Sequence, residues 1–131
     1  MSTLLETLVE WIIVNDLGEG DGIDLFRDVI PDKPDKLICL LEYNSKTSRN
    51  KFNTAAVRYV QVVARDFQAS ECKKAIDKLY ELFSCREDEV TDLPNDRWAI
   101  MFPLQLPFKV REDANRRIYY GFNMAITTSP D

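Results

Sequence analysis

The sequence contains no histidine among its 131 residues. Histidine is the side chain that most often acts as a general base or metal ligand near neutral pH. Its absence excludes Ser-His-Asp and Cys-His catalysis and most zinc or iron centres. A pair of carboxylates, or a Mg²⁺ site built from carboxylates alone, is not excluded on this ground. With no other catalytic pattern in the chain, we expect no enzyme activity, no metal and no cofactor.

Cysteines and long apolar runs are also scarce. Cys39, Cys72 and Cys85 are an odd number and form no C-x-x-C pair. The first two fall in apolar patterns, so we expect small buried hydrophobes in a reducing cytoplasm. The longest apolar runs, Leu37–Leu41 and Trp98–Phe102, have five residues, whereas a membrane-spanning helix needs roughly 20. We therefore expect a soluble protein that does not enter a membrane.

Positive charge is in deficit. The chain has 17 basic and 22 acidic residues, a net charge of −5. Nucleic-acid-binding domains are usually basic, so this balance disfavours tight binding of DNA or RNA. The segment Asn44–Thr54 is an exception, because it carries Lys46, Arg49 and Lys51 and no acid. This basic segment is either a solvated loop or a contact arm for an acidic partner.

Two further segments are expected to be loops without chemistry. Three of the four glycines lie in Gly18-Glu-Gly20-Asp-Gly22. No buried strand precedes them and no Lys-Ser/Thr follows, so they do not form a phosphate-binding loop. Arg86–Arg97 is rich in acids but lacks the alternating oxygen ligands and central glycine of an EF-hand. We expect a mobile turn and a solvated loop.

Hydrophobic periodicity predicts two helices and about four strands. The helices are expected at about 3–16, opened by Thr3 and Glu6 at capping-box spacing, and at about 68–84. The strands are expected at 37–43, 55–66, 98–112 with a break at a proline, and 116–128, where alternation is strict. A short edge strand at Asp24–Arg27 is a further candidate.

These elements predict a single α+β domain spanning residues 1–131, in the order α-β-β-α-β-β. Each helix has one apolar stripe, so both are expected to pack on one face of a mainly antiparallel sheet of about four strands. The polar face of the last strand would then be exposed or available to a neighbouring subunit.

Four stretches occur together in a recognisable order. They are Asn15-Asp-Leu-Gly18; Pro31-Asp-Lys-Pro-Asp35 feeding a strand that ends Leu41-Glu-Tyr43; Val57-Arg-Tyr-Val-Gln-Val-Val-Ala-Arg65; and Pro103-Leu-Gln-Leu-Pro-Phe108 followed by a turn near Asp113 and by Tyr119–Thr127. In combination they resemble the minor capsid, or tail-terminator (tail-completion), proteins of long-tailed bacteriophages, over essentially the whole chain. The basic segment Asn44–Thr54 and Leu106, where such proteins tend to have a proline, depart from that pattern.

The resemblance implies a structural protein of the virion, made in the bacterial host cytoplasm and placed at the tail or neck. Such a protein associates with itself into a ring, commonly a hexamer, that caps the tail tube, ends tail polymerisation and offers a joining surface to the head connector protein. Its partners would be further copies, the tail tube protein and the connector, and DNA would pass through without specific binding. Two alternatives remain: another connector component such as an adaptor or stopper, and a cytoplasmic ligand-binding or regulatory module with a deep apolar pocket.

Five residues are candidates for partner contact. Lys46, Arg49 and Lys51 would dock on an acidic rim of the tube or connector. Phe26 follows the acidic, glycine-rich turn, and Tyr119 falls on the polar side of its strand. Both are aromatic, and aromatic side chains are favoured anchors at interfaces.

Overall fold

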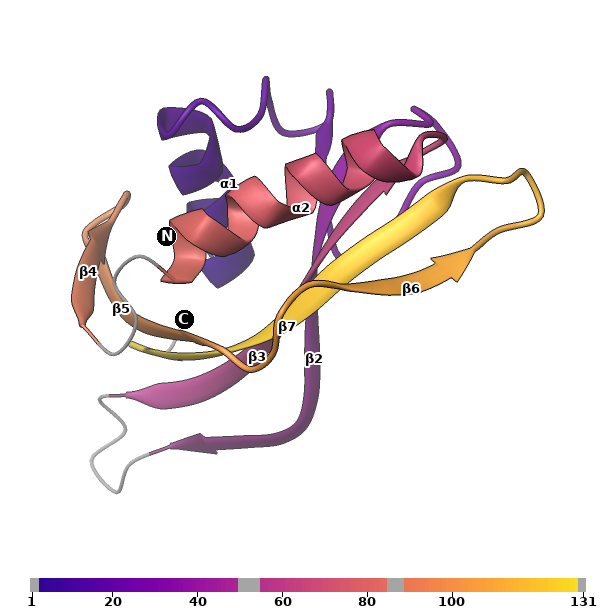
Figure 1. The fold of residues 1–131 in the computed structure, drawn as a ribbon. Helices are drawn as coiled ribbons and strands as arrows, with labels where there is room; N and C mark the ends of the chain where they lie inside the picture. Colours follow the sequence, from indigo (N-terminus) through magenta and orange to yellow (C-terminus); the bar gives the residue numbers. More distant parts are fainter. Residues whose placement is uncertain (1–2, 50–54, 85–88, 130–131) are drawn as a thin grey trace.

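The computed structural model describes residues 3–49, 55–84 and 89–129, and for residues 44–49 the backbone alone. This part of the chain folds into two helices and one seven-stranded sheet (Figure 1). The elements are α1 (Leu4–Val14), β1 (Leu25–Arg27), β2 (Leu37–Arg49), β3 (Ala56–Asp66), α2 (Ala69–Ser84), β4 (Val90–Leu93), β5 (Arg97–Pro103), β6 (Phe108–Glu112) and β7 (Ile118–Thr128).

The strand order in the sheet is β1-β2-β3-β7-β5-β4. β1 runs parallel to β2, and the other pairs are antiparallel. β7 is the central strand: β3 pairs along its full length on one side, and two strands share its other side. β5 pairs with its C-terminal half and β6 with its N-terminal half.

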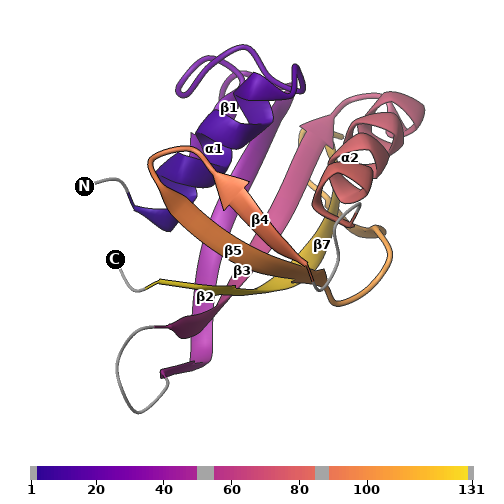
Figure 2. The same ribbon diagram turned by 90° about the vertical axis from the view of Figure 1, so that its left-hand side faces the viewer.

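The sheet curls around the two helices. Figure 2 shows α1 and α2 lying in the trough that the strands form, with β5 and β4 closing one end. α1 contacts β1, β2 and β4, whereas α2 contacts β3, β7 and β5. Long strands carry a right-handed twist, which accumulates across neighbouring strands into a curl of this kind. The result is a half-barrel with a concave, helix-bearing side and a convex side.

The hydrophobic core fills the concave side. Leu4, Leu8 and Ile12 of α1 are fully buried, and so are Ile76 and Phe83 of α2. Aromatic side chains connect the two helices with the sheet. The ring centroid of Phe83 in α2 lies 5.4 Å from that of Trp11 in α1 and 6.2 Å from that of Phe122 in β7, and both pairs are edge-to-face. Such aromatic pairs add about 1 kcal/mol each beyond the area that they bury.

The expected fold class is wrong. The sequence predicted about four mainly antiparallel strands with two helices on one face, in the order α-β-β-α-β-β. The described chain instead has seven strands in a curled, mixed half-barrel sheet, in the order α-β-β-β-α-β-β-β-β. The parallel pairing of β1 with β2 makes the sheet mixed, and the sheet curls around the helices into a half-barrel (Figure 2).

The acid-rich segment is where the prediction failed most. Its acids suggested a solvated loop, but Val90–Leu93 forms β4, because Thr91 and Leu93 point inward while Val90 and Asp92 are exposed. Alternation over only four residues is too short to stand out against the charge around it. The basic segment was also expected to be a loop, yet the backbone of residues 44–49 continues β2.

A candidate interaction site on the convex side of the sheet

The pairing register decides which residues face away from the helices. Directly paired residues point to the same side of a sheet, and successive residues alternate. Val62 pairs with Phe122 and Val60 with Met124, and all four belong to the core. Their neighbours Gln61 and Asn123 therefore point to the convex side, together with the residues in register with them.

One end of the convex side is covered by the segment Asp28–Asp35, here called the pinned loop. The Sγ of Cys39, on the convex side of β2, donates to the carbonyl of Val29 at 3.6 Å. Cys39 and Val63 beneath the loop are buried. Burial, and the nearby Asp28 carboxylate, raise the pKa of the Cys39 thiol to about 12. The thiolate is the reactive form of cysteine, so this residue is inert near neutral pH.

Arg65 of β3 holds the pinned loop through its backbone. Its side chain is 2% exposed. Its Nε donates to the carbonyl of Asp35 at 3.1 Å, and its Nη2 donates to those of Pro34 at 2.6 Å and Asp32 at 3.0 Å. A buried guanidinium must have its donors satisfied. The loop carbonyls supply acceptors that an apolar strand could not.

Arg117, just before β7, holds the same loop by ion pairs. It donates to the Asp32 carbonyl, to the Asp32 carboxylate at 3.1 Å and to the Asp35 carboxylate at 3.2 Å. On its other side, its Nε donates to Asp113 at 2.8 Å. Burial by itself would raise the pKa of Asp113, but hydrogen bonds from Arg117 and Tyr119 lower it to about 2. The same acids raise the pKa of Arg117 above its ordinary value.

Tyr119 completes this network. Its hydroxyl accepts from Arg65 Nη1 at 3.2 Å and donates to the Asp113 carboxylate at 3.0 Å. The Arg111 guanidinium lies over its ring, 4.2 Å from the centroid. A charged group on a ring face in this range is attracted to it. The pinned loop, β3, β6 and the start of β7 are thus tied into one unit.

Beyond the pinned loop the convex side is uncovered, and we call this region the open face. Its ten residues come from β2, β3, β5 and β7; none of them carries a charge, and each is half-buried or exposed in the described structure. They are Leu41, Tyr43, Val57, Tyr59, Gln61, Ile100, Phe102, Asn123, Ala125 and Thr127. Trp98 of β5 and its pairing partner Asp92 of β4 face the same side at the border of this region, and Asp92 is charged.

Aromatic side chains lie at two places on the open face. The rings of Tyr43 and Tyr59 are 5.8 Å apart, and burial together with the Tyr59 hydroxyl raises the pKa of Tyr43. Phe102 of β5 is 40% exposed. The helices lie on the other side of the sheet, and no described segment covers this one. A surface with few charges and with aromatic residues has the composition of an interface core.

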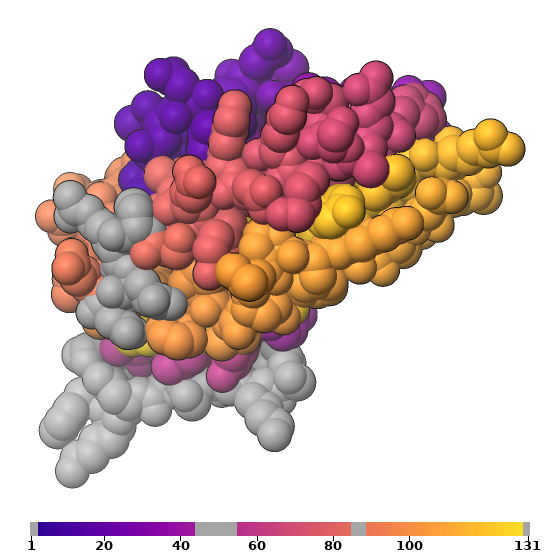
Figure 3. Space-filling model, in the orientation of Figure 1, coloured from indigo at the N-terminus to yellow at the C-terminus, as the bar shows by residue number. Residues whose placement is uncertain are grey.

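An apolar stripe borders the open face along β5, the following connection and β6. Every second residue from Phe102 to Val110 is apolar and exposed: Phe102, Leu104, Leu106, Phe108 and Val110. We call this stripe the apolar ridge; its residues lie on the surface coloured orange in Figure 3. The outer edge of β6 pairs with no strand of the described chain. Exposed apolar edge strands tend to associate, so proteins usually cover them.

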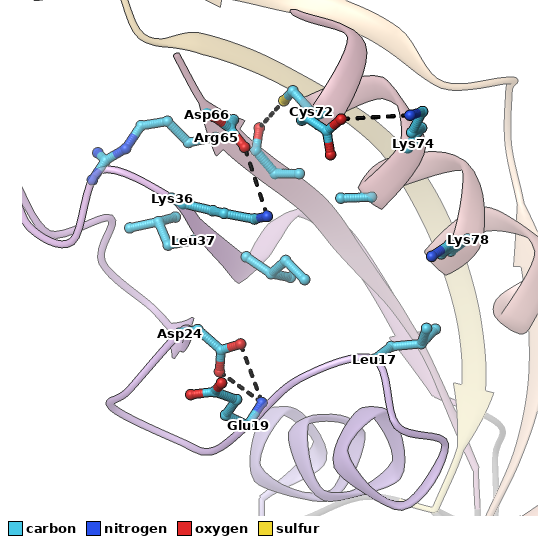
Figure 4. Close-up of a pocket in the computed structure, with 14 residues that line it drawn as sticks. Leu17, Glu19, Asp24, Lys36, Leu37, Arg65, Asp66, Cys72, Lys74 and Lys78 are labelled. Carbon is cyan, nitrogen blue, oxygen red and sulfur yellow. Dashed lines mark hydrogen bonds and ion pairs between the residues drawn. The ribbon is translucent and has the colours of Figure 1, made fainter. Parts of the chain in front are cut away.

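A groove lies on the helix side, between the turn after α1 and the start of α2 (Figure 4). It has a volume of about 460 Å³. Its floor is largely apolar, and Lys36, Lys74 and Lys78 are exposed at its rim. The Cys72 thiol at its floor donates to the carbonyl of Ala64 at 3.2 Å, and burial raises its pKa to about 11.

The carboxylates in this groove have structural partners. Asp24 accepts from the amide of Glu19 at 2.9 Å and from that of Gly20 at 3.1 Å, which closes the glycine turn. Asp66 accepts from the amide of Gln68 at 3.2 Å and lies 3.9 Å from the Lys36 ammonium. Within the described residues there is no group of three or more acids or cysteines able to hold a metal ion.

The predicted contact residues that the structure describes do not form one surface. Lys46 and Arg49 lie in the extended part of β2, and Lys51 lies outside the described residues. Phe26 is half-buried in β1, opposite Cys39. Tyr119 is 2% exposed and belongs to the network that holds the pinned loop.

Sequence reasoning anticipated the exposed face of the last strand, but it missed that four strands share this face, and it missed the arginine network. One usable signal was an arginine at the end of the apolar strand Val57–Arg65, where a buried charge needs partners. Another was the lack of charge at alternate positions of the last strand, from Gly121 to Thr127. A fully solvated face usually carries charges, so uncharged residues at these positions favour the interpretation in which the face meets a neighbouring subunit.

No protein-family model matches the chain, and no curated protein matches it. No helix in the described parts of the chain is both long and apolar enough to cross a bilayer.

Proposed function

We propose that this chain is a structural subunit of a bacteriophage head–tail junction, a tail terminator that caps the tail tube as a ring. The observation that carries the proposal is the open face, which is uncharged, partly aromatic and uncovered in the single chain. Together with the resemblance of the sequence to tail terminators, it favours a protein that acts by binding other subunits.

The lack of charge on the open face is selective. Charged residues make up 30% of the chain, yet none of the ten residues of this face is charged, and the acid Asp92 lies at its border on β4. Contiguous apolar patches beyond a few hundred Å² are rare on soluble monomers and mark interaction sites. We therefore assign the open face to a contact that is buried in the assembled particle.

The pinned loop supports the same role. Arg65 and Arg117 fix it against the sheet, so the border of the open face is held in place before any partner arrives. A preorganised surface loses less conformational entropy on binding than a mobile one. A subunit that must stop a growing tube needs a fixed surface of this kind.

The charge balance fits a channel through which DNA passes. With a net charge of −5, a ring of these subunits repels the phosphate backbone instead of holding it. Replacing acids that face the channel by lysine should slow genome ejection, and unchanged ejection would count against this part of the proposal.

Electron microscopy of particles assembled without this protein tests the proposal. We expect separate heads and tails, with tails of abnormal length, because no ring ends polymerisation. Normally joined particles with tails of normal length would refute the proposed function. Labelling of the end to which the protein binds separates a tail terminator, on the tube, from an adaptor or stopper, on the head.

The groove of Figure 4 favours a second candidate, a ligand-binding or regulatory module. Its volume of about 460 Å³ lies within the roughly 300–1,000 Å³ that small-molecule sites occupy. Calorimetric screening with small anionic metabolites, which the rim lysines would attract, tests this role. Saturable binding that Lys74→Ala and Lys78→Ala abolish would support it, and absence of binding would favour the structural role.

A further inference from the structure

Two edges of the sheet, at β6 and at β1, have opposite charge and both carry exposed apolar residues; β4 ends the strand order as a third edge. Among the described strands β6 pairs only with β7, whereas β1 is the terminal strand on the other side of β3 and β2. The edges are therefore far apart in the strand order of one subunit. In a ring, each edge would be free to meet the opposite edge of the next subunit.

The β6 edge is apolar and basic. The apolar ridge has its most exposed residue at Leu106, which is 72% exposed. Lys109 and Arg111 on β6 and Arg116 in the following turn are also exposed. The nearby acids Glu112 and Asp113 do not balance this charge, because Asp113 is already paired with Arg117.

The β1 edge is apolar and acidic. Ile23 and Val29, which flank β1, are 60% and 70% exposed. Between Asp16 and Val29 the chain has five acids and a single base, Arg27. The exposed acids are Glu19, Asp21 and Asp28, in addition to Asp16. Asp21 and Asp28 lie 3.3 and 3.8 Å from the Arg27 guanidinium, which offsets one of these charges and leaves the edge acidic. We call Glu19, Asp21, Ile23, Asp28 and Val29 the acidic edge.

The acidic edge cannot extend the sheet by backbone pairing. The Leu25 amide donates to the carbonyl of Gly20 at 3.2 Å, and the Gly22 amide donates to that of Leu25 at 2.7 Å. The outer side of β1 is thus already occupied by the glycine turn. A partner must therefore meet this edge through side chains, which are the exposed Ile23 and Val29 and the acids around them.

We propose that the apolar ridge, with Lys109 and Arg111, docks on the acidic edge of a second copy of this chain. Apolar residues meet apolar residues, and basic residues meet acidic ones. The two surfaces are different and lie at opposite edges, so the contact is heterologous and repeats around a closed ring. This inference rests on the proposed function, for which it names the subunit interface.

Charge complementarity identifies the second copy as the occupant. A tube or connector surface that fitted the ridge would also need acids around an apolar patch, but the acidic edge already provides both on this chain. Opposed potentials of this kind fix the register of a contact and reject like-charged surfaces.

Charge reversal in two separate variants tests the inference. Lys109→Glu places an acid against the acidic edge, and Asp21→Lys places a base against the basic one. Each variant alone should fail to form the oligomer that the wild type forms at concentrations up to about 1 mM. In an equal mixture every contact is complementary again, so alternating rings should form. Sedimentation velocity follows assembly, and circular dichroism checks the fold.

Lys78→Glu is the matched control, because it makes the same charge change on the exposed face of α2 and should assemble as the wild type does. The Leu106→Ser variant should lose assembly while keeping its unfolding temperature. Rescue in the mixture would establish the heterologous contact.

Three outcomes would overturn the inference: a mixture of the two variants that assembles no better than each variant alone, a wild type that stays monomeric at about 1 mM, or single variants that assemble as the wild type does. The last of these outcomes would leave ring formation itself standing and place the subunit contact on other residues. The proposed function fails separately, if particles assemble normally without the protein.

Discussion

Arg65 and Tyr119 lie directly opposite each other on β3 and β7, and the guanidinium donates to the phenol oxygen at 3.2 Å. The pair stands where the sheet meets the pinned loop. Arg65 donates to three loop carbonyls, and the Tyr119 hydroxyl in turn donates to the Asp113 carboxylate. This hydrogen-bonded pair is the link between the strands and the border of the open face.

Replacing Arg65 by methionine should destabilise the fold by about 2–4 kcal/mol. The carbonyls of Pro34 and Asp35 and the Tyr119 hydroxyl lose the donor that Arg65 supplies, and the Asp32 carbonyl keeps only Arg117. Denaturant unfolding measures the change, and hydrogen exchange should show faster exchange of amides in residues 28–35. The control Lys73→Met breaks an exposed pair with Asp77 and should cost at most about 0.5 kcal/mol. Equal effects of the two substitutions would remove the special role of Arg65.

Asp113→Asn should change the acid dependence of stability. The folded-state pKa of Asp113, about 2, lies below its ordinary value of 3.8. Its contribution is therefore complete above about pH 4 and is lost as the pH falls toward 2. The variant should be less stable than the wild type at pH 7, and the difference should shrink as the pH approaches 2. Urea unfolding at pH 7, 4 and 2.5 checks this, and a gap that is constant with pH would contradict it.

Gly121→Ala should destabilise the central strand. A Cβ atom there would lie 2.8 Å from the carbonyl oxygen of Val62 and 3.2 Å from Cγ2 of Val110. The first of these neighbours is backbone and cannot move aside cheaply, so we expect a loss of about 1–3 kcal/mol. Asn123→Ala, two residues along the same face, should stay within about 0.5 kcal/mol. Thermal unfolding compares the stability of the two variants. An unfolding temperature of Gly121→Ala equal to that of the wild type would show that the strands shift at this position to make room for the methyl group.

Ala125→Lys should leave the fold intact and abolish attachment of the subunit to the virion. Ala125 is half-buried in the middle of the open face, opposite Tyr59. A lysine there can reach water in the free chain, whereas in an assembled particle its charge would be buried without a partner. Complementation of particles that lack the protein measures attachment, and calorimetry measures stability. Full complementation by this variant would place the open face outside the interface.

Much of the secondary structure is predictable because its signals are local. The helix expected at 68–84 is α2 at Ala69–Ser84, and the strand expected at 55–66 is β3 at Ala56–Asp66. The alternation expected over 116–128 matches β7 at Ile118–Thr128. In each case the apolar residues of one short segment are enough to decide its type.

The architecture is not predictable in this way, because it depends on contacts between distant segments. Nothing local shows that β5 and β6 share one side of β7, or that Arg65 reaches a loop some 30 residues earlier in the chain. The open face is a product of that arrangement. Its residues come from four strands, and each strand alone has the pattern of an ordinary half-exposed one.

Hydroxyl-radical footprinting tests most directly whether the open face is buried in an assembly. The method oxidises exposed aromatic rings, and Tyr43, Tyr59 and Phe102 can be compared in the free chain and in purified virions. Our account predicts oxidation of all three in the free chain and strong protection in the virion, with Phe67, which is 50% exposed in the connection between β3 and α2, as an internal reference. Equal oxidation in both states would contradict it.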